Sequence, residues 1–357
     1  MSNSNEFAKN ILLEIDDLET DELKTDELKT EQFDVALSQA DELETAPVEE
    51  DLFEVNLPNS CMLKTTISDT WQLDDLPNLM MLAMDVVESL FGIEARDRGE
   101  VELFDLEREL ADQLDQGFGD TSPITGTALL AALYGPLGFV GDWERFFAVD
   151  NCLMDRVLSR RRGIPVSMAV LVLYLCERFG IRAEGISFPG HFLVRVFHEP
   201  DADIETDTDT ESDAEISLDS TDSCDIIDPF TGKVLSHHQI EQLLRGARGN
   251  LAKLTPQHLV AAEPLEVIMR LLNVTKASFI HHQHFTHALM CSQLLLTLKP
   301  DCPLERRDRG FLYEQLECHQ LAVDDFEYFI EQCPEDPLAD VLKIQALALD
   351  LLPSLLH

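Results

Sequence analysis

Basic residues are scarce in this chain. Lys and Arg together account for 26 of its 357 residues, against 68 Asp and Glu, so the formal net charge at pH 7 is −42. A field of this sign repels the phosphate backbones of DNA and RNA. We therefore expect no nucleic acid among the partners of this protein.

Long apolar runs and paired cysteines are also missing. No run reaches the roughly 18–20 residues that span a bilayer, and residues 1–6 lack the basic start and apolar stretch of a secretory signal. The eight cysteines are scattered, without a Cys-x-x-Cys pair, which favours free thiols over a disulfide framework or a zinc site. We expect a cytoplasmic protein with no membrane contact, no metal and no cofactor.

Two acidic stretches contain few apolar side chains. Residues 1–57 and residues 201–225 carry charge of almost one sign, and they can bury too little surface to offset the entropy of an ordered chain. We expect disorder in both. The alternative for the first stretch is a partner-binding arm. The alternative for the second is Ca²⁺ binding, although it lacks the glycine-turn spacing of a calcium loop.

Apolar periodicity between these stretches predicts the fold class. Stripes at three- and four-residue spacing indicate helices over 79–90, 100–116 and 127–134. A helix from Pro165 to about 179 is apolar nearly all round, so we expect it to be buried. Short strands are expected at 184–188, 191–197 and 225–228. Residues 70–250 thus predict an α+β domain, in which a helical amino-terminal part covers a small antiparallel sheet around a buried helix.

The last hundred residues contain a repeat. Pro300 recurs as Pro334, 34 residues later, and helical patterning accompanies this period. Such a period is typical of tetratricopeptide helix hairpins. Residues 256–352 are therefore predicted to be an all-α tail of two hairpins and a last helix. That is too few repeats for a free solenoid, so the tail should dock on the core. The first hairpin departs from the pattern at Lys276, where a small residue is usual.

Several short motifs occur in order through the central region and the tail. They are Leu137-Gly-Phe139, Asn151, Arg162-Gly-Ile-Pro-Val-Ser167, Gly185, Phe188-Pro-Gly-His-Phe-Leu-Val-Arg195, Asp228-Pro-Phe230 and Arg307-Asp-Arg-Gly310. In this combination, over roughly residues 70–350, the chain resembles the bacterial SirB-type family. That family joins a transglutaminase-like core to a tetratricopeptide tail.

The resemblance implies a catalytic pattern. The wider transglutaminase-like fold places a Cys nucleophile at the start of a buried helix, a His base on the next strand pair and an orienting Asp on the following strand. By this resemblance His191 matches the base and Asp228 the orienting acid. Pro165 falls at the usual Cys position, and Ser167, two residues further on, is the nearest hydroxyl. The candidate catalytic residues are therefore Ser167, His191 and Asp228, and the candidate binding residues are Arg195 and Asn151.

Each candidate also has a structural interpretation. Ser167 can satisfy a free N–H in the first helical turn, and His191 with Asp228 can form a buried pair that serves the fold. Arg195 can be a half-buried ion-pair residue. The basic cluster Arg160–Arg162 suits a solvated face or a dock for the acidic stretches of the chain, with a patch for an acidic partner as the alternative. His284 and His287 could hold a metal at i, i+3 spacing, but surface histidines are the favoured interpretation.

Two functions remain open from the sequence. One is a non-catalytic or weakly catalytic protein that binds a protein or peptide, with a regulatory role. The other is a hydrolase or acyltransferase that acts on amide-like substrates through Ser167, His191 and Asp228. The missing Cys favours the first, whereas the intact His and Asp favour the second. Whether the chain is an enzyme, and its oligomeric state, are not predicted.

Overall fold

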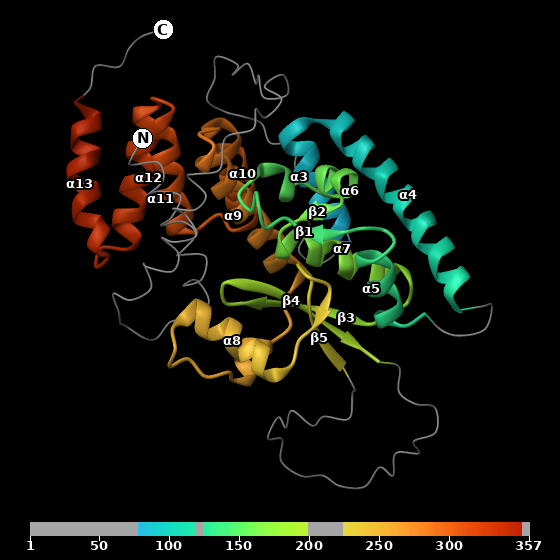
Figure 1. Ribbon diagram of the computed structural model, residues 1–357. Helices are drawn as coiled ribbons and strands as arrows, with labels where there is room; N and C mark the ends of the chain where they lie inside the picture. Colours follow the sequence, from blue (N-terminus) through green and yellow to red (C-terminus); the bar gives the residue numbers. More distant parts are fainter. Residues whose placement is uncertain (1–77, 119–123, 199–223, 352–357) are drawn as a thin grey trace, which may run out of the picture.

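A buried helix, α7 (Pro165–Arg178), lies at the centre of the fold. The computed structural model describes residues 78–118, 124–198 and 224–351 (Figure 1). Pro165 occupies the first turn of α7, where its missing N–H has no intrahelical partner to lose. Every residue from Pro165 to Val172 is buried, as an all-apolar helix requires. The acidic stretch 1–57 and residues 201–223 of the stretch 201–225 lie outside the described residues, so their expected disorder stays a prediction. For the last two residues of the second stretch, Cys224 and Asp225, it was wrong, because they belong to a strand.

An antiparallel sheet packs against α7. Its strand order is β3-β4-β5-β6, and a tight turn at Gly190 (φ +65°) sets Phe188 opposite His191 between the first two strands. The predicted strands are present within a residue or so of their expected ends. The sheet consists of β3 (Ala183–Phe188), β4 (His191–Phe197), β5 (Cys224–Asp228) and β6 (Lys233–Val234).

Two strands of the core have only two residues each, and the sequence did not predict them. β1 (Val140–Gly141) and β2 (Arg162–Gly163) form a separate parallel pair. The last strand of the larger sheet, β6, is equally short. Segments of this length show no alternation of apolar and polar residues, so periodicity cannot reveal them.

The two faces of the sheet meet different partners. Along β4, Phe192, Val194 and Val196 join the main core with α7, whereas Leu193 belongs to a smaller cluster. This alternation is the ordinary two-residue period of a strand. The smaller cluster is completed by side chains of α8 (His237–Arg248) and of the 3₁₀ turn η3 (Pro256–Leu259), which cover the second face.

Helices from the amino-terminal side cover the core (Figure 1). They are α3 (Leu79–Phe91), α4 (Ile93–Phe118), α5 (Gly126–Tyr134) and α6 (Met154–Arg160), with a 3₁₀ turn η2 (Val149–Asn151) before α6. Gly92 ends α3 at φ +83°, as predicted. Helix α4 begins earlier than the expected residue 100. Its first turns lack an apolar stripe, but Arg96 pairs there with Asp85, Glu88 and Glu100.

The tail consists of two helical hairpins and a last helix, as predicted. These helices are α9 (Pro264–His281), α10 (Phe285–Leu298), α11 (Pro303–Gln315), α12 (His319–Gln332) and α13 (Pro337–Asp350). Apolar side chains of the tail and of α3 and α7 belong to one continuous core. Phe91 of α3, for example, stacks on His287 of α10 with ring centroids 5.3 Å apart. The tail is therefore docked on the core.

Lys276 has a structural role that the repeat pattern did not predict. Its ammonium group is fully buried and lies 2.7 Å and 2.9 Å from the carboxylate oxygens of Glu305 and 3.2 Å from Asp308. Burial alone would lower the pKa of Lys276, but the two carboxylates outweigh it and raise that pKa. The residue that breaks the small-residue pattern thus ties α9 to α11 by a buried ion pair.

The favoured interpretation of the histidines as surface residues is wrong for His287. Its side chain is buried and stacks on both Phe91 and Phe279, at centroid distances of 5.3 Å and 5.0 Å. Burial and the neighbouring His284 lower the pKa of His287 to about 4. Neutral imidazole can stack as an aromatic ring, and the core accepts it in that form.

Candidate functional site

His191 and Asp228 meet at one end of the sheet. His191 is the first residue of β4 and Asp228 the last residue of β5, and antiparallel pairing of Val194 with Ile227 brings these two ends together. Nε2 of His191 lies 2.8 Å from Oδ1 of Asp228. The two side chains are 15% and 12% exposed, respectively. The register of β4 against β5 therefore brings together the two residues that the resemblance paired.

Three donors hold the carboxylate of Asp228. Besides His191, the Phe230 N–H donates to Oδ1 at 2.9 Å and the Thr231 hydroxyl donates to Oδ2 at 2.7 Å. Burial by itself raises the pKa of Asp228, but the hydrogen bonds and the charge of its neighbours prevail and lower it. The carboxylate is thus ionised near neutral pH. It can orient the His191 ring and stabilise its protonated form.

The start of α7 borders this pair through a chain of main-chain contacts. The Gly141 N–H donates to the Phe230 carbonyl at 3.0 Å, and Gly141 pairs with Gly163 across the β1–β2 ladder. Gly163 lies two residues before Pro165. A Cβ on Gly141 would lie 2.4 Å from the Phe230 ring, so only glycine allows this close approach.

Ser167 uses its hydroxyl to hold the start of α7. Its Oγ accepts the Ile164 N–H at 3.0 Å and donates to the main-chain carbonyl of Asn151 at 2.6 Å. The side chain is fully buried, and His191 is not among its hydrogen-bond partners. This geometry supports the capping interpretation of Ser167, and a nucleophilic role has no geometric support here.

The nearby thiols do not replace the missing nucleophile. Cys152 and Cys176 are both buried. Burial raises the pKa of Cys152 to about 11 and that of Cys176 to about 12. Because the thiolate is the reactive form, both thiols are unreactive near neutral pH. By the resemblance Pro165 falls at the usual Cys position, and a proline side chain offers no nucleophile.

The two candidate binding residues have partners within the fold. Arg195 pairs with Glu184 at 2.9 Å and donates to the Leu259 carbonyl at 2.6 Å, which joins the sheet to η3. Asn151 is fully buried; its amide donates to the Arg145 carbonyl at 2.6 Å and accepts from Arg160 at 3.0 Å. Both side chains stabilise the fold, and a direct binding role for either stays a prediction.

One exposed aromatic side chain beside this pair was not predicted from the sequence. Trp143, two residues after β1, is 70% exposed, and its ring meets the Phe230 ring edge-on at 4.3 Å. Phe230 in turn donates its N–H to Asp228. A lone Trp in a short polar segment was the available signal, but only the fold shows that it borders the His191–Asp228 pair.

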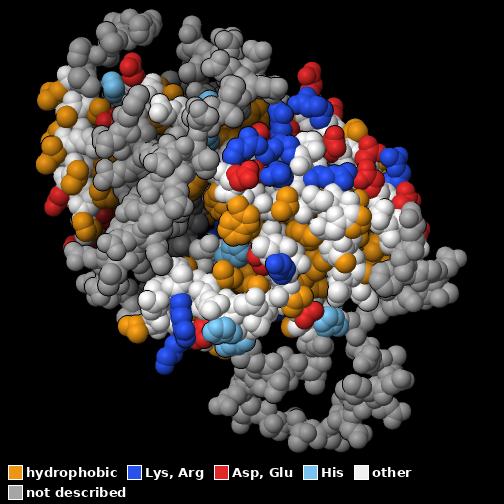
Figure 2. Space-filling view, in the orientation of Figure 1, with side chains coloured by type: hydrophobic (Ala, Val, Ile, Leu, Met, Phe, Trp, Pro, Cys, Tyr) orange, Lys and Arg blue, Asp and Glu red, His pale blue; other side chains and the backbone are white. Residues whose placement is uncertain are grey.

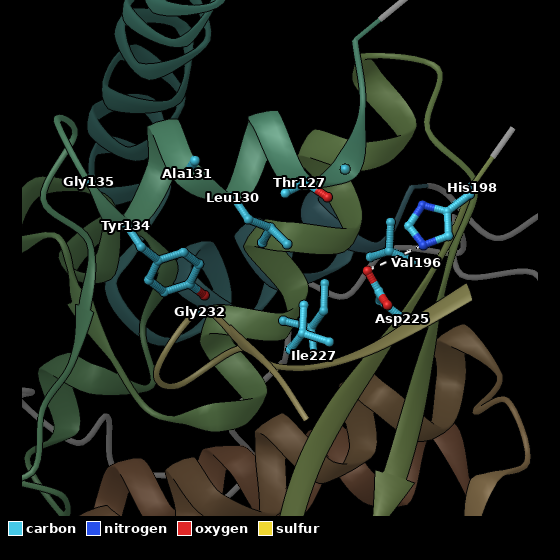
Figure 3. Close-up of a pocket in the computed structure, with 12 residues that line it drawn as sticks. Thr127, Leu130, Ala131, Tyr134, Gly135, Val196, His198, Asp225, Ile227 and Gly232 are labelled. Carbon is cyan, nitrogen blue, oxygen red and sulfur yellow. Dashed lines mark ion pairs between the residues drawn. The ribbon is translucent and has the colours of Figure 1, made fainter. Parts of the chain in front are cut away.

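A separate hollow lies between α5 and the strands β4, β5 and β6 (Figure 3). Its volume is about 240 Å³, and Leu130, Val196 and Ile227 supply much of its apolar lining. An ion pair of 3.3 Å between His198 and Asp225 stands at one side (Figure 3). Neither His191 nor Asp228 lines it. This hollow is therefore not the place where those two residues would act.

The described residues show neither a metal site nor a membrane-spanning helix. No three His, Cys, Asp or Glu side chains in the described part of the chain are grouped so that they could hold a metal ion. Among the helices that the structure describes, none combines the length and apolarity needed to cross a bilayer.

Comparison with known proteins extends the resemblance. Residues 100–273 match the Transglutaminase-like superfamily, and residues 275–346 match the Tetratricopeptide repeat. The UPF0162 protein of Vibrio cholerae is 41% identical over 222 residues, which cover 62% of this chain and 74% of the relative. The UPF0162 protein YchA of Escherichia coli and protein SirB1 of Salmonella typhimurium are each 33% identical over 217 residues, or 61% of this chain and 73% of each relative. No solved structure matches the chain.

These matches confirm the family that the motifs around His191 and Asp228 indicated. They also agree with the architecture, because the superfamily match covers the sheet and α7, and the repeat match begins within α9. The chain belongs to the UPF0162/SirB1 family, in which a transglutaminase-like core is followed by a tetratricopeptide region.

Proposed function

We propose that this chain is a non-catalytic, or at most weakly catalytic, transglutaminase-like protein that acts by binding a protein or peptide, with a regulatory role. One observation carries the proposal. The Ser167 hydroxyl is donated to the Asn151 carbonyl at 2.6 Å, and Pro165 stands at the position of the usual nucleophile. The start of α7 therefore presents no group that could attack a substrate carbonyl.

The tetratricopeptide tail supports binding as the activity. Such repeats form extended surfaces that contact other proteins. The last helix, α13, buries one stripe against α12 and exposes Val341, Ile344 and Leu347 on another. An apolar stripe that remains exposed on a folded protein is the kind of surface that associates with a partner.

We place this activity in the cytoplasm. The seven cysteines in the described residues are all free, which fits a reducing compartment. The net charge of −42 disfavours nucleic acid as the partner, so a protein or peptide remains the favoured class.

The second candidate function is hydrolysis or acyl transfer on amide-like substrates. The 2.8 Å contact between His191 and Asp228 favours it, because a base and the acid that orients it are two of the three members of a catalytic triad. For catalysis Ser167 would have to leave its bonds to Ile164 and Asn151 and turn toward His191. Each such bond to a buried group contributes on the order of 1 kcal/mol, and the group left behind loses its partner.

Labelling with a fluorophosphonate probe separates the two functions. The purified full chain is incubated with the probe, alongside His191→Ala and Ser167→Ala variants, and hydrolysis of amide substrates is followed in parallel. We expect no covalent label and no hydrolysis above the His191→Ala background. A label that both substitutions abolish would overturn the non-catalytic proposal. The His191→Ala variant keeps the test valid if the Ser167→Ala variant fails to fold.

A further inference from the structure

The segment 142–147 holds an aromatic side chain out into solvent. Trp143 is 70% exposed, and its ring rests edge-on against Phe230 with an interplanar angle of 78°. An indole carries a large apolar area and few rotatable bonds, so Trp is among the residues that most often dominate binding interfaces. A single exposed Trp is not by itself a binding site. The contacts of the rest of the segment support a binding role for Trp143.

The segment is fixed by hydrogen bonds at several points. The buried carboxylate of Asp142 accepts the Arg145 N–H and a guanidinium N–H of Arg160, both at 3.1 Å. Asn151 holds the Arg145 carbonyl at 2.6 Å, and His282 of the tail lies 3.1 Å from the Phe147 carbonyl. Because the backbone is held in place, a ligand that meets Trp143 would have little conformational entropy to remove from it.

Further aromatic rings extend from this segment toward the tail. The Phe146 ring lies 6.2 Å from Phe230 and 5.4 Å from Phe147, and the Phe147 ring lies 5.3 Å from His281 at the end of α9. The surface around Trp143 is thus continuous with the first hairpin of the tail. A bound segment could contact both the core and the repeats.

Two exposed arginines belong to the segment that carries Trp143 and to the strand that pairs with β1. Arg145 lies in the same segment, and Arg162 pairs with Val140 in the β1–β2 ladder that leads into it. Neither forms an ion pair with another residue that the structure describes, whereas Arg160 and Arg161 of the same cluster pair with Asp142 and Glu109. Figure 2 shows Lys and Arg side chains beside hydrophobic ones on the face over β1, β2 and α6.

We propose that Trp143, Arg145 and Arg162 form a binding surface for an acidic peptide segment of another protein. An apolar side chain of that segment would pack on the indole, and its carboxylates would pair with the two guanidinium groups. This inference rests on the proposed binding function and names the chemistry of the partner. Local charge favours an acidic occupant, because the two guanidinium groups outnumber the one exposed carboxylate of the segment, Glu144.

The first test asks whether the surface is open in the full chain. The sequence contains two tryptophans, Trp71 and Trp143, so Trp71→Phe leaves Trp143 as the only reporter. We expect acrylamide to quench its fluorescence readily. Weak quenching in the free chain would mean that one of the chain's own acidic stretches occupies the surface, and it would overturn the proposal of an external partner.

The second test identifies the ligand chemistry. A display library of random 12-residue peptides is selected on the full chain, and enriched peptides are measured by fluorescence anisotropy. We expect Asp- and Glu-rich sequences with an apolar residue, and binding that weakens as salt rises. Affinity should fall at least tenfold in Trp143→Ala and in the double variant Arg145→Glu/Arg162→Glu. Arg108→Glu, an exposed site on α4, should leave affinity within twofold.

The outcomes separate this inference from the proposed function. Acidic peptides that bind Trp143→Ala as tightly as the natural chain would overturn the inference but leave peptide binding intact. Enrichment of neutral or basic peptides, or of none, would overturn it as well. Covalent labelling by the fluorophosphonate probe is the separate result that would overturn the non-catalytic function.

Discussion

Ser167 donates its hydroxyl hydrogen to the main-chain carbonyl of Asn151, 2.6 Å away and sixteen positions earlier in the chain. The Asn151 side-chain amide in turn donates to the Arg145 carbonyl and accepts a hydrogen bond from the Arg160 guanidinium group. The start of α7 is thereby linked to the segment that carries Trp143. Ser167, a candidate catalytic residue, and Asn151, a candidate binding residue, thus together hold the start of α7 and the Trp143 segment in place.

Removing the Ser167 hydroxyl should weaken the fold. In Ser167→Ala the Ile164 N–H and the Asn151 carbonyl lose a buried partner, which costs about 1–3 kcal/mol of unfolding free energy. Urea unfolding at pH 7 measures it. The matched control is Ser159→Ala, an exposed serine whose replacement should change stability by less than about 0.5 kcal/mol. Equal stability of the two variants would refute the capping role.

Asp228→Asn should destabilise the protein in a pH-dependent way. The folded state lowers the pKa of Asp228, so the carboxylate contributes stability above its unfolded pKa of about 3.9 and loses it as pH falls through the folded pKa. We expect a deficit of about 1–3 kcal/mol relative to the natural chain at pH 7, and a smaller one at pH 3. Unfolding curves at the two pH values measure it, and a deficit that is larger at pH 3 than at pH 7 contradicts it.

His287 should make the docked tail sensitive to mild acid. The pKa of His287 is about 4 in the fold, below the ordinary value of 6.5. Between pH 6.5 and pH 4, His287 is therefore protonated in the unfolded chain but neutral in the folded chain. The free energy of unfolding falls as the pH falls through this range. From pH 7.5 to 5.5, the natural chain should lose about 1 kcal/mol more than His287→Phe, which keeps the ring stack. The exposed His238→Asn variant is the control, and it should follow the natural chain.

Lys276 should be costly to remove alone. Lys276→Met leaves the carboxylate of Glu305 buried without its cation, and breaking a buried pair in this way costs about 3–5 kcal/mol. Asp308 keeps its ion pair with Arg307 at 2.8 Å. Adding Glu305→Gln removes the stranded charge and should recover a large part of that loss. Thermal and urea unfolding of the single and double variants measure it. A double variant less stable than Lys276→Met would show that Glu305 serves another purpose.

Regular elements with a strong period were predictable. Helix α7 and the strands that carry His191 and Asp228 follow from apolar runs and alternation, and Gly92 marks the end of α3 as expected. The start of α4 was not predictable, because charged side chains around Arg96 support it in place of an apolar stripe. His287 was misread as a surface residue because several histidines crowd the turn before α10, whereas its neighbours in space are Phe91 and Phe279.

The sequence by itself determined the family and the order of core and tail, and through the family resemblance it predicted that His191 and Asp228 lie together. The pairing of β4 with β5, two strands far apart in the chain, brings them into contact. Only the tertiary structure decided what Ser167 does. Its acceptor is a main-chain carbonyl, and every residue has one, so no side-chain pattern encodes the contact. The exposure of Trp143 was likewise decided by packing, since the loop that presents it is held by Asp142, Asn151 and Arg160 from separate elements.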